Sequence, residues 1–308
     1  TVHVVTGAGL EYFVNPSRGL DIGTCRFGGS PVSWQSPQGD IAPAFFSDRG
    51  NDWLRTACGG MLMTCGLRQA GAPCEDQGEA LGLHGRAHHT PARQVAAQGC
   101  WDGDDYVMQV SGLVEETRMF GEILKLYRVI ESRLGVNEIR IRDVVENRGF
   151  NPSPLMLLYH FNFGFPLLSE DAEITLPARD IDPRDARAPA TGFDRWEPPT
   201  AGFEEQCYYH SGFVTDKDGF TRASVRNRAF PVAGGVTSLK ASVCWKPEQL
   251  PCMVQWKMCG EGMHVLGVEP ANCRIAGRAA VRDSGALPTI APEQQQVFET
   301  VLRFETPA

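Results

Sequence analysis

Apolar and polar residues alternate with a period of two along this chain, in short segments separated by glycine and proline. The 308 residues include 33 glycines and 21 prolines, so little uninterrupted length remains for amphipathic helices. Residues 123–147 form two alternating runs around a turn at Leu134-Gly135, which is typical of a long antiparallel hairpin. A similar run near the C-terminus places four residues on one face of a strand, namely Phe298, Thr300, Leu302 and Phe304. The pattern predicts an all-β protein with large antiparallel sheets packed face to face.

The charge balance limits the kinds of partner that the chain can have. Its net charge is -8 and its pI is about 5.4, whereas nucleic acids and anionic membranes select clustered lysine and arginine. No apolar run reaches the roughly 20 residues of a membrane span, and no signal-peptide pattern is visible. Ten cysteines without CxxC pairs indicate reduced, buried thiols. We expect a cytoplasmic monomer or homodimer that binds a small neutral or weakly charged ligand.

The most apolar stretch runs from Pro154 to Leu168 and contains one ionisable side chain, His160. Its aromatic content favours a buried strand. A histidine in such a strand is either held in the core by hydrogen bonds or exposed to a cavity within the core. The first arrangement is the commoner one, because buried polar groups usually have partners.

Two stretches interrupt the alternating pattern. Residues 47–71 contain the pair Gly59-Gly60, which indicates a close backbone approach, but no GxxxxGK[ST] phosphate loop is present. Residues 177–205 contain five prolines and mixed charges and could form an interdomain linker. This stretch also carries three aromatic residues, which solvated linkers avoid. We therefore expect an ordered loop packed near the site.

Three further histidines cluster in one segment, at His84, His88 and His89. The H-x3-H spacing could present two imidazoles to a metal on one helical face. However, glycines within the segment and Pro91 after it disfavour a helix, and no HExxH motif is present. We expect no metal site and no requirement for a transition metal.

Glu269 ends an apolar segment just before Pro270. It could simply turn toward solvent at the end of a strand. Alternatively, it could lie at the mouth of the core, where burial would favour the protonated form and raise its pKa into the range that suits a general base.

Several segments, in this order, resemble landmarks of the aldose 1-epimerase (galactose mutarotase-like) family, and in particular a poorly characterised branch of it. They are SRGLDIG near the start, LHG at residues 83–85, YHFNFG at 159–164, LGVEPAN at 266–272 and the later LPTIAPEQQQVFETVLRF. Each motif alone is weak, but the ordered set covers most of the chain. The resemblance implies a β-supersandwich in which residues 1–308 form a single domain.

The resemblance also implies a catalytic set. Glu269 would take the proton from the anomeric hydroxyl, and His160 would donate a proton to the ring oxygen, which opens the pyranose. His84 would hydrogen-bond the ring oxygen and hold it. No cofactor is implied, and each positioned acid or base typically contributes about 10²- to 10⁴-fold.

The family's substrate-binding arginine has no clean counterpart in this sequence. Arg55 or Arg68 would substitute for it, with Arg55 preferred because it lies beside Trp53 and ahead of the paired glycines. Glu205 would replace an aspartate that binds sugar hydroxyls. Asn162 and Trp196 complete the predicted binding set.

Two other classes of function remain compatible with these residues. A sugar isomerase or lyase could use the same Glu and His pair to remove a carbon-bound proton. A non-catalytic carbohydrate-binding protein would need hydroxyl partners and an aromatic platform, but no basic carboxylate facing two imidazoles. Convergence of Glu269, His84 and His160 around one sugar ring would favour an enzyme.

Overall fold

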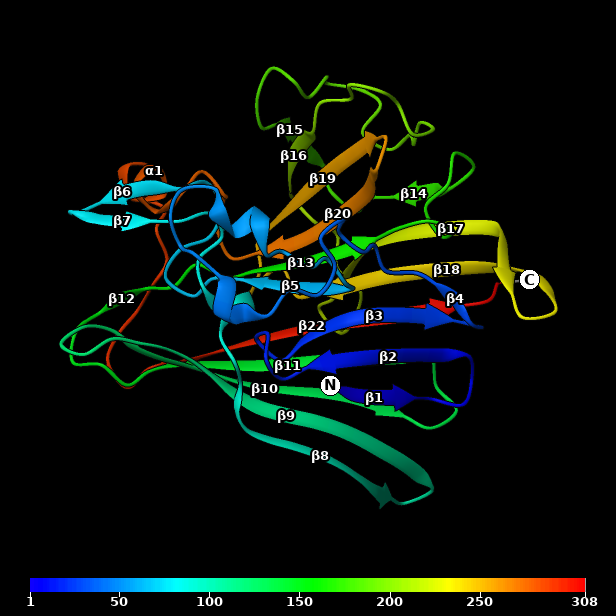
Figure 1. Ribbon diagram of the computed structural model, residues 1–308, viewed down its shortest axis with the longest axis horizontal. Coiled ribbons are helices and arrows are strands. Elements are labelled where there is room, and N and C mark those ends of the chain that lie inside the picture. Colours follow the sequence, from blue (N-terminus) through cyan, green and yellow to red (C-terminus); the bar gives the residue numbers. More distant parts are fainter. Residues whose placement is uncertain (308) are drawn as a thin grey trace.

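The computed structural model describes residues 1–307, and most of its strands form three antiparallel sheets (Figure 1). The eight-stranded sheet contains, in spatial order, β14 (Glu173–Thr175), β17 (Thr221–Val232), β18 (Gly235–Trp245), β22 (Gln295–Glu305), β11 (Glu138–Asn147), β10 (Ile123–Arg133), β9 (Asp105–Thr117) and β8 (Arg93–Asp102).

A six-stranded sheet crosses the upper part of the view in Figure 1 and carries the candidate site described below. Its strands, in spatial order, are β15 (Asp180–Pro183), β16 (Gln206–Ser211), β19 (Cys252–Gly260), β20 (Met263–Ala271), β13 (Leu158–Phe163) and β5 (Leu62–Cys65). A four-stranded sheet near the N-terminus contains β1 (Val2–Val5), β2 (Leu10–Asn15), β3 (Asp21–Phe27) and β4 (Ser30–Pro31).

The remaining elements are short. Two strand pairs join β6 (Cys74–Asp76) to β7 (Glu79–Leu81) and β12 (Ser153–Pro154) to β21 (Thr289–Ile290). The helices of the described residues are α1 (Arg278–Asp283) and the 3-10 turns η1 (Pro43–Phe45), η2 (Asp52–Arg55) and η3 (Ala87–His89). None of these helices has the length and apolar character needed to span a bilayer. The ten cysteines are free thiols, and most of them are buried.

The prediction of an all-β protein is confirmed, and the strongest local patterns correspond to real strands. The hairpin predicted over residues 123–147 is formed by β10 and β11, which pair in antiparallel register. The predicted C-terminal strand is β22, which lies between β18 and β11. Its four residues expected on one face are all buried, because that face packs into the core.

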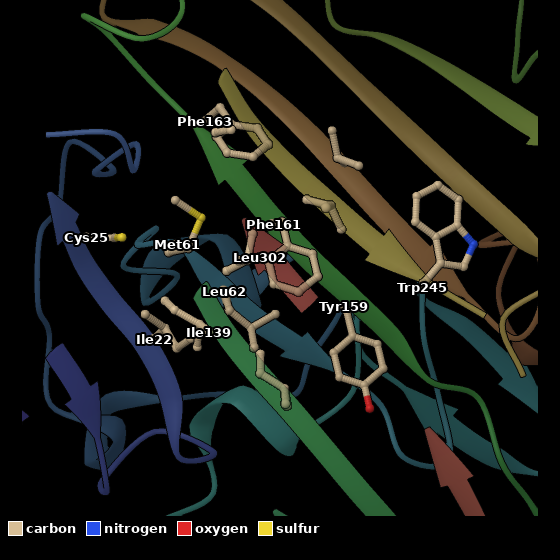
Figure 2. Close-up of a cluster of buried hydrophobic side chains, with 14 of the residues drawn as sticks. Ile22, Cys25, Met61, Leu62, Ile139, Tyr159, Phe161, Phe163, Trp245 and Leu302 are labelled. Atoms are coloured by element: carbon tan, nitrogen blue, oxygen red, sulfur yellow. The ribbon is translucent and has the colours of Figure 1, made fainter. Parts of the chain in front are cut away.

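Strand β13 separates two groups of buried side chains. Tyr159, Phe161 and Phe163 belong to the large core, which takes residues from all three sheets, and Figure 2 shows them on one side of the strand. Residues on the opposite face, such as Leu158, belong to a smaller cluster that also includes Val254 and Ala271. Alternation along the strand therefore directs His160 to the second face, away from the large core.

A buried ionic network connects the three sheets on the large-core side of β13, the side that carries Tyr159. Arg128 of β10 donates to both carboxylate oxygens of Asp143 in β11, at 2.9 and 2.6 Å, and to Asp21 of β3 at 2.6 Å. The Tyr159 hydroxyl donates to Asp143 at 2.6 Å. His88 Nδ1 lies 2.7 Å from the Asp21 carboxylate. The network thus joins strands of all three sheets to the segment that carries the clustered histidines.

Candidate active site

His160 and Glu269 lie opposite each other on neighbouring strands of the six-stranded sheet. The register of β13 and β20 pairs Phe161 with Val268, so the residues beside them, His160 and Glu269, also lie opposite each other. His160 Nε2 is 3.2 Å from Glu269 Oε1. The side chains are nearly inaccessible, because His160 is 6% exposed and Glu269 is 2% exposed.

Burial sets the protonation of this pair. It raises the pKa of the Glu269 carboxyl well above its usual value. Burial, assisted by the nearby His84, lowers the pKa of His160 to about 3. The pair therefore holds one proton over a wide pH range, because the first proton binds tightly and the second binds weakly. One side chain can then donate a proton while the other accepts one.

His84 approaches from the loop between β7 and η3, in a left-handed backbone conformation with φ of 58°. Its Nδ1 accepts a hydrogen bond from the Gly71 amide at 3.3 Å, and burial lowers its pKa to about 4. The imidazole is therefore neutral, with its hydrogen on Nε2 as a donor. The His84 and His160 rings meet edge to face, with centroids 6.0 Å apart.

The loop can place His84 here because the next residue is glycine. Gly85 has a φ of 71°. A Cβ atom at this position would collide with the carbonyl oxygens of Gln69 and Gly66. The LHG motif thus lets the loop pass close against the chain that follows β5.

Gly267 provides room for Glu269 on the surface of β20. The two residues are on the same face of the strand, because they are two positions apart. A Cβ atom at Gly267 would collide with Glu269 Oε1 and would lie 2.9 Å from Cβ of Trp256. Glycine is therefore required for the carboxyl group to lie flat against the sheet.

His84, His160 and Glu269 line a cavity of about 810 Å³, called here the active-site cavity. Its volume is in the range of small-molecule sites. Its walls include three tryptophans and one tyrosine, namely Trp34, Trp53, Trp256 and Tyr209. The buried Nε1 atoms of Trp53 and Trp256 have no hydrogen-bond partner among the described residues. Aromatic surface with neutral donors is suited to a sugar ring and its hydroxyls.

Besides Glu269, the charged residues of the cavity wall are Arg184, Arg187, Arg274 and Glu205. Arg184 Nη2 donates to Glu205 Oε1 at 2.8 Å, and Arg184 Nε donates to Asp185 at 2.9 Å. Glu205 was expected in the site, and it lines the cavity. Arg184 was not singled out, although it belongs to the proline-rich stretch 177–205 that was expected near the site. The expectation that this stretch packs near the site is the sequence feature that points to Arg184.

The arginines that sequence reasoning placed in the site lie elsewhere. The Arg55 side chain is 82% exposed and pairs with Asp52. Arg68 binds Glu79 and Glu122 at 2.9 and 3.1 Å. Neither lines the active-site cavity. This is a correction to the expected geometry: the guanidinium groups of the cavity wall belong to Arg184, Arg187 and Arg274. Arg184 is close enough to Glu269 to oppose the rise of its pKa.

Asn162 and Trp196 also lie outside the cavity wall. The Asn162 amide donates to the carbonyl oxygens of Gly60 and His160, at 3.1 and 3.0 Å, so it supports the strand that carries His160. Trp196 is buried, with its ring 5.7 Å from the Lys257 ammonium. As placed, neither residue can contact a sugar in the cavity.

The clustered histidines do not form a metal centre in the described part of the chain. No group of three His, Cys, Asp or Glu side chains has the arrangement of metal ligands there. His88 contacts Asp21, and His89 Nε2 lies 2.9 Å from the Thr56 hydroxyl. Of the three histidines, only His84 lines the active-site cavity.

The architecture is that of galactose mutarotase-like proteins. A Klebsiella pneumoniae structure, provisionally described as an aldose 1-epimerase, is 27% identical with a TM-score of 0.87, over 96% of this chain and 77% of that one. A galactose mutarotase-like protein from Clostridium acetobutylicum is 13% identical with a TM-score of 0.59, over 99% and 95% of the chains. An aldose epimerase homologue from C. elegans is 13% identical with a TM-score of 0.58, over 100% and 99%. The last two show a shared fold.

The sequence profile of the domain of unknown function DUF4432 matches residues 1–304. The chain belongs to this family. A search of curated proteins found no match to the sequence.

Proposed function

We propose that the protein is an isomerase of the aldose 1-epimerase type, which interconverts the anomers of a monosaccharide or sugar derivative. The observation that carries the proposal is the 3.2 Å approach of His160 Nε2 to Glu269 Oε1 in a cavity lined by aromatic side chains. A paired acid and base of this kind matches a reaction that removes one proton and adds another at adjacent oxygens.

The reaction conserves protons. The resting pair carries its proton on Glu269, and transfer to His160 gives a carboxylate and an imidazolium. The carboxylate accepts the proton of the anomeric hydroxyl, the bond from the anomeric carbon to the ring oxygen breaks, and His160 protonates that oxygen. His84 donates its Nε2–H to the ring oxygen and holds it in place. Rotation about the first carbon–carbon bond and closure by the reverse steps give the other anomer and restore the pair. The steps require no cofactor.

Anomer exchange measured by magnetisation-transfer NMR on a panel of free sugars tests this proposal. Glu269→Gln should lower the exchange rate on the active sugar by at least about 10²-fold, the low end for losing a general base. Glu261→Gln is the matched control, because Glu261 is exposed in the turn between β19 and β20, the strand that carries Glu269. Unchanged exchange in Glu269→Gln would show that Glu269 is structural.

The same spectra separate the competing functions. Formation of a ketose or an unsaturated product would indicate the isomerase or lyase chemistry open to the same pair. Saturable binding of sugars with no exchange and no product would indicate a carbohydrate-binding protein.

A further inference from the structure

A second cavity of about 490 Å³ lies beside the active-site cavity, and nothing in the proposed reaction uses it. The two cavities share three wall residues, Tyr209, Arg274 and Ala276. Both therefore border the same short stretch of chain, and a ligand larger than one ring could extend from one cavity into the other.

The sheet register gives the distance between the two cavities. Val254 of β19 lines the active-site cavity and pairs with Glu269, while Cys252, two residues earlier on the same face, lines the second cavity. Two residues of a strand span about 7 Å. A group in the second cavity would thus be adjacent to a sugar that contacts Glu269.

Of the residues shared by the two cavities, the Arg274 side chain is held weakly, whereas Tyr209 is buried. The Arg274 guanidinium lies over the Tyr209 ring, 4.7 Å from its centroid, and pairs with Asp182 at 2.9 Å. Both partners of this ion pair are more than half exposed, at 57% and 60%. Exposed pairs contribute about 0–1 kcal/mol, so a ligand can displace the Arg274 side chain at little cost.

The walls of the second cavity are neutral and of mixed polarity. Arg274 is the one charged lining residue, and Asp182 neutralises it. Hydroxyl groups come from Ser211 and Ser284, whereas the Asn272 amide is bonded to the backbone of Leu155 and Leu157. His210 borders the cavity, but its imidazole points to the other face of β16 from Tyr209, where its Nε2 lies 3.0 Å from Gln255.

Apolar surface occupies the rest of this cavity, on Cys252, Cys273, Val281 and the alanines of α1 and the loop that follows it. Carbon surface with a few neutral polar groups matches an uncharged, hydroxyl-bearing ring, and a phosphate or carboxylate would find no unpaired cation here. A sugar unit has this chemistry.

We propose that the second cavity is a subsite for a second sugar unit, and that the substrate is a reducing disaccharide whose reducing ring reacts at Glu269 and His160. The inference rests on the proposed function for the assignment of the reacting ring. Binding to the second cavity is a separate statement that can be tested without catalysis.

Calorimetric titration with lactose, maltose and cellobiose, each compared with galactose and glucose, provides that test. At least one disaccharide should bind about tenfold more tightly than either monosaccharide, which corresponds to about 1.4 kcal/mol. Ala280→Trp should remove this difference and leave monosaccharide binding within about twofold, since a bulky ring fills the second cavity alone. Asp283→Trp is the control, because Asp283 is exposed on the same helix outside the cavity.

Two results would overturn the subsite: no disaccharide in the panel binds more tightly than the monosaccharides, or Ala280→Trp weakens both kinds of sugar equally. Ala286→Trp provides a second filled variant if Ala280→Trp does not fold, because Ala286 also lines the second cavity alone. Exchange of monosaccharide anomers without any disaccharide preference would reject the subsite and leave the proposed function standing. Tighter disaccharide binding without anomer exchange of any sugar would support the subsite and reject the proposed function.

Discussion

Glu269 is a buried carboxyl group whose burial costs stability once the pH is high enough to ionise it in the unfolded chain. Its folded-state pKa is raised by burial, so its contribution to stability is fully present below the unfolded value of about 4.5 and is lost as the pH rises through the raised folded value. Glutamine has no such dependence. We therefore expect Glu269→Gln to be more stable than the wild type at about pH 8, with the difference shrinking toward about pH 4.

Denaturant unfolding at several pH values measures this difference in the free energy of unfolding. Glu261→Gln should show no pH-dependent gain, because Glu261 is exposed. A Glu269→Gln variant that is less stable than the wild type at every pH would mean that the carboxylate is compensated by partners in the folded protein.

Gly267 controls the position of the Glu269 carboxyl. In Gly267→Ala the new methyl group collides with Glu269 Oε1 and crowds Trp256, so the carboxyl must move away from its place opposite His160. Overpacking of this kind typically costs about 1–3 kcal/mol. We expect folded protein whose rate of anomer exchange falls by at least about tenfold, because a small misplacement of a reacting group is costly.

Gly260→Ala is the matched control on the same hairpin. A Cβ atom there meets mainly the flexible end of the Met258 side chain, which can turn aside. Equal activity of the two variants in NMR exchange would show that the position of Glu269 tolerates displacement.

At the scale of elements, the stretch from β15 to β16 supplies the charged wall of the site. Arg184 follows β15 and binds Glu205, which precedes β16. Glu205→Ala should raise the half-saturating sugar concentration by about 10- to 100-fold while changing the turnover less, because a charge-assisted hydrogen bond is lost in the ground and transition states alike.

Arg55→Ala is the control for this experiment, because the exposed Arg55 side chain lies outside the cavity. Steady-state kinetics on the active sugar should show no change in either constant for this variant. A large effect of Arg55→Ala together with none for Glu205→Ala would require a different sugar-binding wall.

The elements also explain which residues of the candidate site could be predicted from the sequence. His160 and Glu269 lie in strands whose apolar patterns are local, so their burial and their motifs could be recognised directly. The place of Arg184 depends on contacts distant in sequence, such as its backbone amide bonded to the Cys207 carbonyl at 2.8 Å. Arg55 and Trp196 carried suitable chemistry in suitable segments, but the packing of those segments turned their side chains away from the cavity.

At the scale of the whole molecule, the buried ionic network joins the three sheets beneath the site. Arg128 lies between Asp21 and Asp143, and the hydroxyl of Tyr159 completes the hydrogen bonding of Asp143. Tyr159 and His160 are adjacent residues on opposite faces of β13. The network therefore anchors the strand that carries the proposed acid without taking part in the chemistry.

Tyr159→Phe tests this separation of stability from chemistry. The variant keeps the buried ring but removes the 2.6 Å hydrogen bond to Asp143, and hydrogen bonds to charged groups contribute about 1.5–3 kcal/mol. We expect the free energy of unfolding, measured in denaturant, to fall by about this amount, with anomer exchange per folded molecule unchanged within about twofold because the face of β13 that carries His160 is untouched. Tyr127→Phe, at an exposed position on β10, should change stability by less than about 0.5 kcal/mol. Equal stability of the two variants would mean that Asp143 gains nothing from the hydroxyl, and a large loss of exchange in folded Tyr159→Phe would mean that the network also sets the position of His160.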